Sequence, residues 1–195
     1  MKNNLTNLLV FVIGALALIT LSLYFARRFR SQMRPFYENI ENLAQTLQGT
    51  PIKLMGCIDF EPALIGSWAK DKYTLKYCSS DFGALPHILR LELYKRSPIR
   101  LSIFANNMRP SKVLFLKKLH TGNADLDKFD FYSNKPEEAK TYLLSHQATL
   151  KELTASGWSI PSFGRRSISI YADISHSIDA GAIKVALQNL AELRN

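Results

Sequence analysis

The first pattern along the chain is an uncharged apolar run from Leu5 to Phe25, which arginines follow directly. A helix of this length and composition can cross a hydrocarbon core of roughly 30 Å. Tyr24 and Phe25 lie at the end of the run, where aromatic side chains favour the membrane interface. The pattern therefore predicts a transmembrane anchor over residues 1–26.

A cleaved signal peptide and a buried core helix are the other interpretations of this run. A signal peptide has an apolar stretch of about 7–15 residues that ends at a small-residue cleavage site. This run is longer, and its small residues Ala15 and Ala17 lie inside it rather than after it. A core helix normally has polar residues on one face, whereas this segment has no charged residue. A retained anchor explains the pattern better than either.

The basic residues beside the run predict which way it is oriented. Lys and Arg close to a span tend to stay on the cytoplasmic side, and anionic lipid attracts each of them by about 1 kcal/mol. The sequence predicts a single-pass protein of the cell inner (cytoplasmic) membrane with its larger domain in the cytoplasm. Lys2, in the short tail on the other side, runs against this rule. The residues expected to contact the membrane surface are Arg27, Arg28, Arg30 and Arg34.

Residues 27–50 are predicted to form a juxtamembrane segment and an amphipathic helix. Pro35 marks the exit from the juxtamembrane segment, and Gly49 and Pro51 end the helix. Its acidic polar face favours packing on a sheet over lying on anionic lipid, which is the alternative. The apolar positions that recur at helical spacing are Phe36, Ile40, Leu43, Ala44 and Leu47.

Residues 51–195 are predicted to form one α+β domain. Apolar and polar residues alternate over residues 72–77, 89–94, 99–103 and 168–174, as in antiparallel strands with one buried face. We expect further strands at 113–116 and 128–132, and two helices between Asn134, as N-cap, and Gly157. A last helix is expected from Ser177, with an apolar stripe at Ile178, Ala182, Val185, Ala186, Leu190 and Leu193. The predicted fold is therefore an N-terminal transmembrane helix followed by an antiparallel sheet packed on one face by helices.

The charge of the chain does not favour nucleic acid as a partner. The net charge is +9 and the pI about 9.6, but four arginines of this excess lie beside the predicted span. The other basic residues are dispersed and are not interleaved with aromatic residues, as they are on a single-strand binding surface. Cys57 and Cys78 are expected to be reduced, buried side chains in a cytoplasmic domain, and a disulfide is the alternative if the domain lies outside.

No motif in the sequence predicts a catalytic residue, a cofactor or a metal. The acidic residues Asp125, Asp127 and Asp130 lack the glycine and the distant glutamate of a calcium loop, so a solvated turn is expected. Trp68 and Trp158 flank turns, where they either line a groove or pack at a sheet edge. The isolated histidines, expected to be solvated or locally hydrogen-bonded, are His87, His120, His146 and His176.

One segment carries a resemblance to known sequences. Residues 121–131 read TGNADLDKFDF, and Pro136, Ala139 and Leu143-Leu144 follow. The pattern resembles uncharacterised bacterial single-span membrane-anchored proteins, in which a T-G-x-x-x-L/F-D segment precedes a strand and a proline-led helix. The likeness covers roughly residues 115–195. It implies a shared fold and no particular activity.

These patterns together favour a non-enzymatic binding or interaction domain held at the membrane. Its expected partners are membrane lipid and a protein partner in a membrane complex. The alternative is a membrane-surface enzyme with no recognisable motif, and a contact with anionic lipid or nucleic acid through the basic residues is a third hypothesis.

Overall fold

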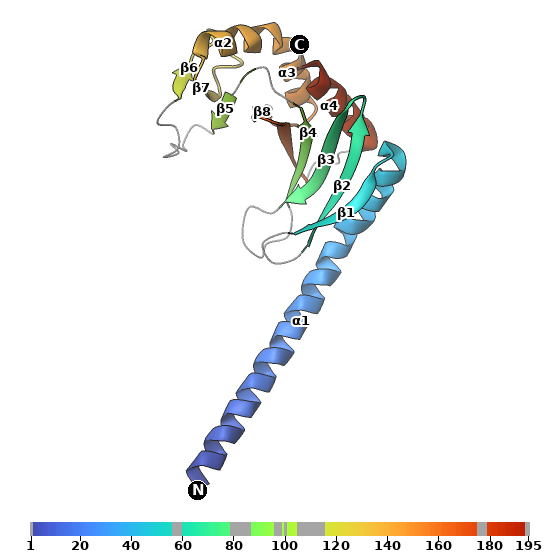
Figure 1. Ribbon diagram of the computed structural model, residues 1–195, viewed down its shortest axis with the longest axis vertical. Coiled ribbons are helices and arrows are strands. Elements are labelled where there is room, and N and C mark those ends of the chain that lie inside the picture. Colours follow the sequence, from blue (N-terminus) through green and yellow to red (C-terminus); the bar gives the residue numbers. More distant parts are fainter. Residues whose placement is uncertain are drawn as a thin grey trace. The chain divides into compact units, whose positions relative to one another are not determined.

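The computed structural model describes residues 2–55, 60–78, 87–95, 99, 101–104, 116–174 and 179–193. The chain forms two compact units, Met1–Asn39 and Ile40–Asn195. Helix α1, Lys2–Leu47, contributes to both of them (Figure 1). The second unit contains all the strands and the other helices of the described chain.

Within the first unit, α1 exposes a long apolar surface. Phe11 is 74% exposed and Leu18 67% exposed. Among the described residues, α1 alone is long and apolar enough to cross a membrane, judged by length and composition. The helix also continues through Pro35, where the sequence placed the exit from the juxtamembrane segment. Proline costs one backbone hydrogen bond there, since it has no N–H, and the remaining bonds of this long helix outweigh that loss.

In the described part of the second unit, nine strands form one antiparallel sheet in the order β1-β2-β3-β4-β9-β8-β5-β7-β6 (Figure 1). The last strand along the chain, β9, therefore lies in the middle of the sheet. The strands are β1 Thr50–Met55, β2 Phe60–Trp68, β3 Asp71–Cys78, β4 Ile88–Tyr94, β5 Leu101–Phe104, β6 Lys117–Leu119, β7 Asp130–Ser133, β8 Ser162–Phe163 and β9 Ile168–Asp173.

Three further helices complete the fold: α2 Pro136–Ser145, α3 Gln147–Ala155 and α4 Ala180–Glu192. Pro136 starts α2 with glutamates in its first turn, an arrangement that suits a helix N-terminus. Helix α3 ends before Gly157, whose φ of +83° is the left-handed conformation that terminates helices. The side chain of Asp179 caps α4 by accepting a hydrogen bond from the backbone N–H of Ala182 at 2.7 Å.

The register of the central strands separates the two faces of the sheet. A row of fully buried apolar residues crosses four strands at Leu64, Leu75, Leu91 and Ile170. The neighbouring row, Ile65, Thr74, Glu92 and Ser169, points to the opposite face. Side chains alternate between the faces of a strand, so this register places the apolar core on one side, whereas the buried residues of the opposite row, Thr74 and Ser169, are polar.

Helices cover the face that carries the buried row. The hydroxyl of Tyr73 donates to the carbonyl oxygen of Leu47 at 3.2 Å, which joins β3 to the last turn of α1. Helix α4 packs against β4 on this side and also contacts α3. The α+β fold, an antiparallel sheet packed on one face by helices after a long apolar helix, is confirmed.

The structure corrects three details of the sequence prediction. The N-cap of α2 is Lys135 rather than Asn134, and it makes no side-chain capping bond. Helix α4 begins at Ala180, not Ser177, which lies outside the described residues. Its buried face is also rotated, because Val185 is 41% exposed while Ile183 and Leu187 are buried. The strand predicted at 113–116 lies almost wholly outside the described residues, and β6 begins at Lys117.

Candidate functional site

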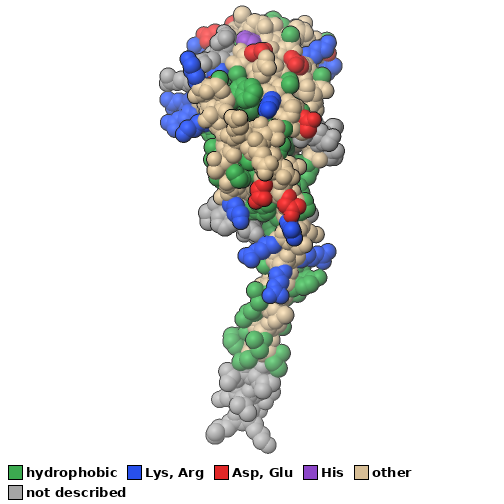
Figure 2. Space-filling model, turned by 90° about the vertical axis from the view of Figure 1, so that its right-hand side faces the viewer, with side chains coloured by type: hydrophobic (Ala, Val, Ile, Leu, Met, Phe, Trp, Pro, Cys, Tyr) green, Lys and Arg blue, Asp and Glu red, His purple; other side chains and the backbone are tan. Residues whose placement is uncertain are grey.

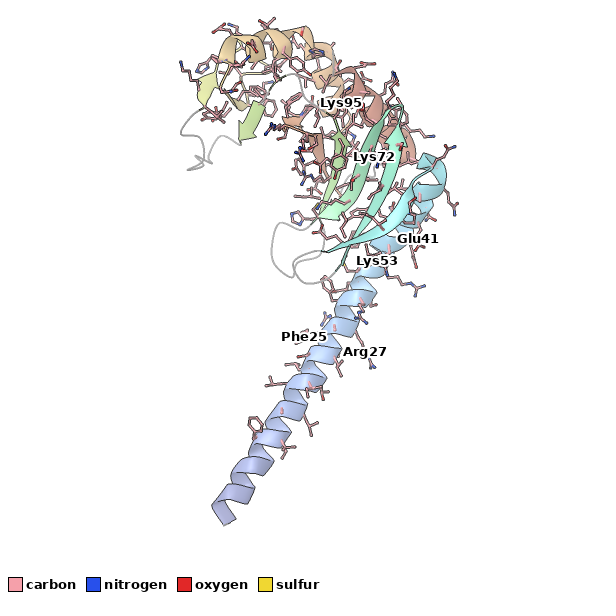
Figure 3. All side chains as sticks on the ribbon, in the orientation of Figure 1. Phe25, Arg27, Glu41, Lys53, Lys72 and Lys95 are labelled. Carbon is pink, nitrogen blue, oxygen red and sulfur yellow. The ribbon has the colours of Figure 1, made fainter. Side chains whose placement is uncertain are left out.

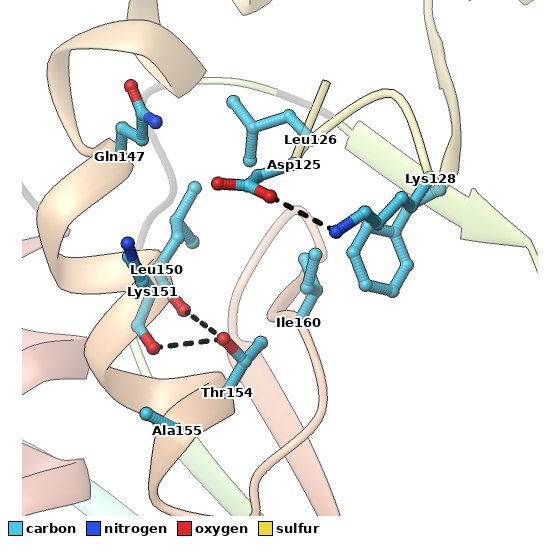
Figure 4. A pocket seen from close by; sticks show the side chains of 10 residues that line it. Asp125, Leu126, Lys128, Gln147, Leu150, Lys151, Thr154, Ala155 and Ile160 are labelled. Atoms are coloured by element: carbon cyan, nitrogen blue, oxygen red, sulfur yellow. Dashed lines mark hydrogen bonds and ion pairs between the residues drawn. The ribbon is translucent and has the colours of Figure 1, made fainter. Parts of the chain in front are cut away.

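A half-open pocket of about 410 Å³ lies between α3 and the segment 121–129, which we call the TGN loop. Helix α3 contributes one face to it, because four of its lining residues follow the i, i+3, i+4, i+7 spacing. Ile160, which follows α3, closes another side (Figure 4). The ten lining residues are Asp125, Leu126, Lys128, Phe129, Gln147, Leu150, Lys151, Thr154, Ala155 and Ile160.

The floor of the pocket is apolar. Leu126 of the TGN loop, Leu150 of α3 and Ile160 are all buried, and Phe129 is half-buried beside them. The hydroxyl of Thr154 is engaged within α3. It donates to the backbone carbonyl oxygens of Leu150, at 3.2 Å, and of Lys151, at 2.9 Å. The polar groups therefore gather at the rim, and a nonpolar surface remains beneath them.

The TGN loop is built around the carboxylate of Asp127. Its Oδ1 accepts hydrogen bonds from the backbone N–H and the hydroxyl of Thr121, both at 2.8 Å. Its Oδ2 accepts from the backbone N–H of Gly122 at 3.0 Å, and Gly122 has the left-handed φ of +76°. These bonds favour the charged carboxylate, so the Thr121 hydroxyl above all, with the backbone N–H groups, lowers the pKa of Asp127. Asp127 thus closes the loop and fixes the pocket wall.

The rim of the pocket carries one carboxylate and two ammonium groups. Lys128 Nζ lies 3.1 Å from Asp125 Oδ1, and both side chains are well exposed. The hydrogen bond and the charge of Lys128 lower the pKa of Asp125, and the charge of Lys151 adds to this effect. Lys151 itself makes no ion pair within 4 Å among the described residues. The rim therefore has an excess of one positive charge.

The four arginines predicted to contact the membrane surface lie on the exposed surface of α1. Arg27 directly follows the apolar part of the helix that ends near Phe25 (Figure 3). A band of basic side chains along this part of the helix is visible in Figure 2. Arg27, Arg30 and Arg34 share one face by their spacing, and Arg34 Nε pairs with Glu38 Oε1 at 2.7 Å. Their contact with the membrane surface stays a prediction.

Cys78 and the two tryptophans singled out in the sequence do not line the pocket. Cys78 lies half-buried at the end of β3, where burial raises the pKa of its thiol and disfavours the reactive thiolate. Cys57 lies outside the described residues, so the pairing of the two cysteines stays untested. Trp158 is buried next to α3 and Trp68 is half-buried at the end of β2, and neither lines the pocket.

The acidic residues near the TGN loop are engaged separately. Asp125 pairs with Lys128, Asp127 with the loop backbone, and Asp130 with Lys118. Within the described ranges, no group of three or more His, Cys, Asp or Glu side chains is placed to hold a metal ion. The sequence predicted only that Asp125 and Asp127 lie in a solvated turn. No pattern in the sequence indicated that this turn lies beside α3, because β7 and α2 separate the TGN loop from α3 along the chain.

The architecture defines an α+β protein with a long N-terminal apolar helix, and its second unit carries a half-open pocket. No protein-family model matches the chain, and no curated protein matches its sequence. The fold is similar to the crystal structure of the mycobacterial trehalose monomycolate transport factor A, TtfA, with a TM-score of 0.57 and 9% sequence identity. The match covers 83% of this chain and 97% of that chain. The similarity at this level of identity is one of fold.

Proposed function

We propose that this chain is a membrane-anchored, non-enzymatic protein whose α+β domain binds a partner or ligand at the membrane surface. The proposed organisation is an anchor at 1–26, a juxtamembrane segment and helix at 27–50, and the α+β domain at 51–195. The observation that carries the proposal is the exposed apolar surface of α1, which is followed at once by basic residues.

Exposure of the α1 surface to water is energetically unfavourable. Seven of its exposed large side chains, those of Phe11, Val12, Ile13, Leu16, Leu18, Ile19 and Leu21, are each at least 47% exposed. A contiguous apolar surface of this kind marks an interaction site in proteins, and a hydrocarbon core removes it from water along the whole helix. A retained span therefore accounts for this surface better than a free helix.

The basic residues after the span support a cytoplasmic location for the domain. Arg27, Arg28 and Arg30 are exposed and make no ion pair among the described residues, so their charge is available to lipid headgroups. Arginines beside a span favour the cytoplasmic side and anionic lipid. We infer that they contact the inner membrane surface of a bacterial cell and fix the orientation of the chain.

The chemistry of the pocket supports binding rather than catalysis. A general acid or base at neutral pH needs a pKa near that pH. The lowered pKa of Asp125, which its ion pair with Lys128 causes, moves this carboxyl away from that range.

The fold is also shared with a protein described as a transport factor, and we extend to this chain the role of a component in a membrane-associated process.

Alkaline carbonate extraction of cell membranes tests the anchor. An integral chain stays in the membrane pellet, whereas a peripheral one is released to the supernatant. Replacement of Leu16 and Ile19 by lysine, which places two charges in the predicted span, is expected to release the chain. Release of the unaltered chain would contradict the anchor.

Thiol labelling of intact cells tests the orientation. The chain is prepared with Cys57→Ser and Cys78→Ala, and one new cysteine is introduced at the exposed position Gln188 of α4 or at Asn3 near the N-terminus. An impermeant reagent is expected to label Asn3→Cys from outside and to reach Gln188→Cys only after lysis. Labelling of Gln188→Cys in intact cells would reverse the orientation while leaving the anchor in place.

Chemical cross-linking of the full-length chain in its native membrane tests the interaction role. A discrete adduct larger than the chain supports a protein partner. Recovery of the unmodified chain alone, across cross-linkers of several lengths, would count against one.

A further inference from the structure

We propose that the pocket between α3 and the TGN loop binds a single-chain anionic amphiphile, of which a medium-chain fatty acid is the simplest form. The hydrocarbon chain lies along Phe129, Thr154 and Ala155, above the buried Leu126, Leu150 and Ile160, and the acidic headgroup pairs with Lys151 at the rim. The proposal rests on the membrane-tethered binding role described above, for which it names the ligand class.

The interior of the pocket matches a hydrocarbon chain in both character and size. Thr154 directs its hydroxyl to helix carbonyl oxygens, so no unpaired donor from this side chain faces the ligand. Ala155 leaves open space at the last turn of α3, where a larger side chain would fill the pocket. A methylene group occupies about the 30 Å³ that a water occupies in the liquid, so a volume of about 410 Å³ holds on the order of ten to thirteen carbons.

The charges at the rim select the headgroup. Asp125 and Lys128 neutralise each other through their 3.1 Å contact, and this leaves the ammonium group of Lys151 without an ion-pair partner in the described part of the chain (Figure 4). An anionic headgroup compensates that charge, whereas a cationic headgroup would add to it. A carboxylate or a phosphate would serve equally, and both occur on single-chain membrane amphiphiles.

The arrangement of the loop keeps this pocket open. Asp127 binds the backbone of Thr121 and Gly122, and Asn123 Oδ1 accepts from the backbone N–H of Asp125 at 3.0 Å. These bonds hold the loop in one conformation at the side of α3. The ligand therefore meets a site that is already formed, which lowers the entropic cost of binding.

Photo-cross-linking tests the proposal on the full-length chain in lipid nanodiscs. The probe is dodecanoic acid that carries a diazirine in the chain and a terminal alkyne for enrichment, and labelled residues are mapped by mass spectrometry. We expect labels on residues 125–129 and 147–160, in addition to the background on α1 that any membrane probe produces. Labelling confined to α1 would overturn the proposal.

Two matched pairs of variants make the test specific. Ala155→Phe fills the pocket and is expected to lower labelling of both segments at least fivefold, whereas Ala148→Phe, exposed on α3 outside the pocket, leaves it unchanged. Lys151→Gln is expected to lower labelling at least threefold, and Lys184→Gln on α4 is its control. Equal labelling of Ala155→Phe and Ala148→Phe would overturn the site.

Competition distinguishes the headgroup. Unlabelled dodecanoate and lysophosphatidic acid are expected to displace the probe, and dodecyltrimethylammonium, which has the same chain and the opposite charge, to displace it at least fivefold less well. Equal displacement by the cationic amphiphile would overturn the anionic class. Carbonate extraction of the same chain separates a failure of the pocket proposal from a failure of the anchor. A chain that stays in the membrane pellet but is not labelled at the pocket contradicts the ligand proposal and not the membrane-tethered role.

Discussion

Lys95 Nζ donates a hydrogen bond to the carbonyl oxygen of Ala191 at 2.9 Å and thereby joins the end of β4 to the last turn of α4 (Figure 3). The last carbonyl groups of a helix have no partner within the helix, and a buried one must find a donor elsewhere. Lys95 is 7% exposed and also lies 3.9 Å from Asp71. Its charge is therefore held between a helix terminus and a carboxylate.

Replacement of Lys95 by Met is expected to lower the free energy of unfolding by about 2 kcal/mol, the range of a charged hydrogen bond lost in a buried place. The methionine keeps the aliphatic packing of the lysine stem but leaves the Ala191 carbonyl without its donor. Both tryptophans of the chain, Trp68 and Trp158, lie in the α+β unit. Urea unfolding followed by tryptophan fluorescence thus reports on this unit alone, with the exposed Lys184→Met as control.

Tyr142 provides a second cap for the same helix, because its hydroxyl donates to the carbonyl oxygen of Leu193. Tyr142→Phe is expected to cost about 1 kcal/mol of unfolding free energy in the same measurement. An effect no larger than that of Tyr171→Phe, an exposed tyrosine on β9, would contradict this role.

The stability that Tyr142 provides is expected to depend on pH. Burial raises the pKa of its phenol in the folded chain. The folded state thus favours the neutral phenol. The contribution of Tyr142 to the free energy of unfolding is therefore fully present at a pH below the pKa of an unfolded tyrosine, about 10, and is lost as the pH rises above that value. In urea unfolding, the free energy of unfolding is expected to fall more between pH 8 and pH 11 for the unaltered chain than for Tyr142→Phe.

Gly66 faces Tyr73 directly across the β2–β3 hairpin, and a Cβ at Gly66 would overlap the tyrosine ring. The ring cannot move away freely, since its hydroxyl binds the Leu47 carbonyl. Gly66→Ala is therefore expected to destabilise the α+β unit by about 2 kcal/mol, as overpacking in a core does. The exposed neighbour Ser67→Ala should stay within about 0.5 kcal/mol of the unaltered chain in urea unfolding.

Asp127→Asn removes the charge that accepts three hydrogen bonds in the TGN loop. We expect the free energy of unfolding to fall by about 1 kcal/mol, a modest value because the carboxylate is exposed to solvent. The pKa of Asp127 is lowered in the folded chain. The stability that this carboxylate provides is therefore present at a pH above the pKa of an unfolded aspartate, about 4, and is lost as the pH falls through the pKa of the folded chain. The difference between the two chains in urea unfolding should therefore shrink from pH 7 towards pH 3, and a difference that is unchanged at pH 3 would contradict this role.

The juxtamembrane charges are predicted to determine the orientation of the chain. Replacing the four arginines by glutamine removes about 1 kcal/mol of lipid attraction each, and mixed orientations are expected in the thiol-labelling assay on Gln188→Cys. The changed residues are Arg27, Arg28, Arg30 and Arg34.

A control removes the same number of exposed positive charges from the α+β unit. It replaces Lys117, Arg165, Arg166 and Lys184 by glutamine. Orientation should be unchanged in this control, and a comparable loss of orientation in both chains would show that total charge, rather than its place beside the span, decides the outcome.

Local patterns in the sequence predicted most of the secondary structure. Alternation over residues 72–77 and 168–174 was sufficient for β3 and β9, because one face of each strand is buried. Alternation fails for β8, which has two residues, too few to show a period. The rotated face of α4 has a different cause: apolar residues occur on more than one side of this helix, and the sequence does not distinguish Val185, which is exposed, from Ile183 and Leu187, which are buried.

The pocket could not be predicted in the same way. Its walls come from segments that β7 and α2 separate in the chain, and only the packing of α3 beside the TGN loop brings Leu126 and Leu150 together. Thr121, Gly122 and Asp127 were recognised as a motif, but their chemistry is directed at their own backbone. The sequence thus indicated where a well-defined loop lies and gave no indication of what it faces.

The central position of β9 determines when the sheet can be completed. Residues 88–93 of β4 pair with residues 168–173, and β8 and β5 follow on the far side of β9. The two halves of the sheet therefore stay unjoined during synthesis until β9 has been made. Pairings of such high sequence separation form slowly. Until β9 is made, the nascent chain has an incomplete sheet with an open β4 edge, a state in which it depends on protection from aggregation.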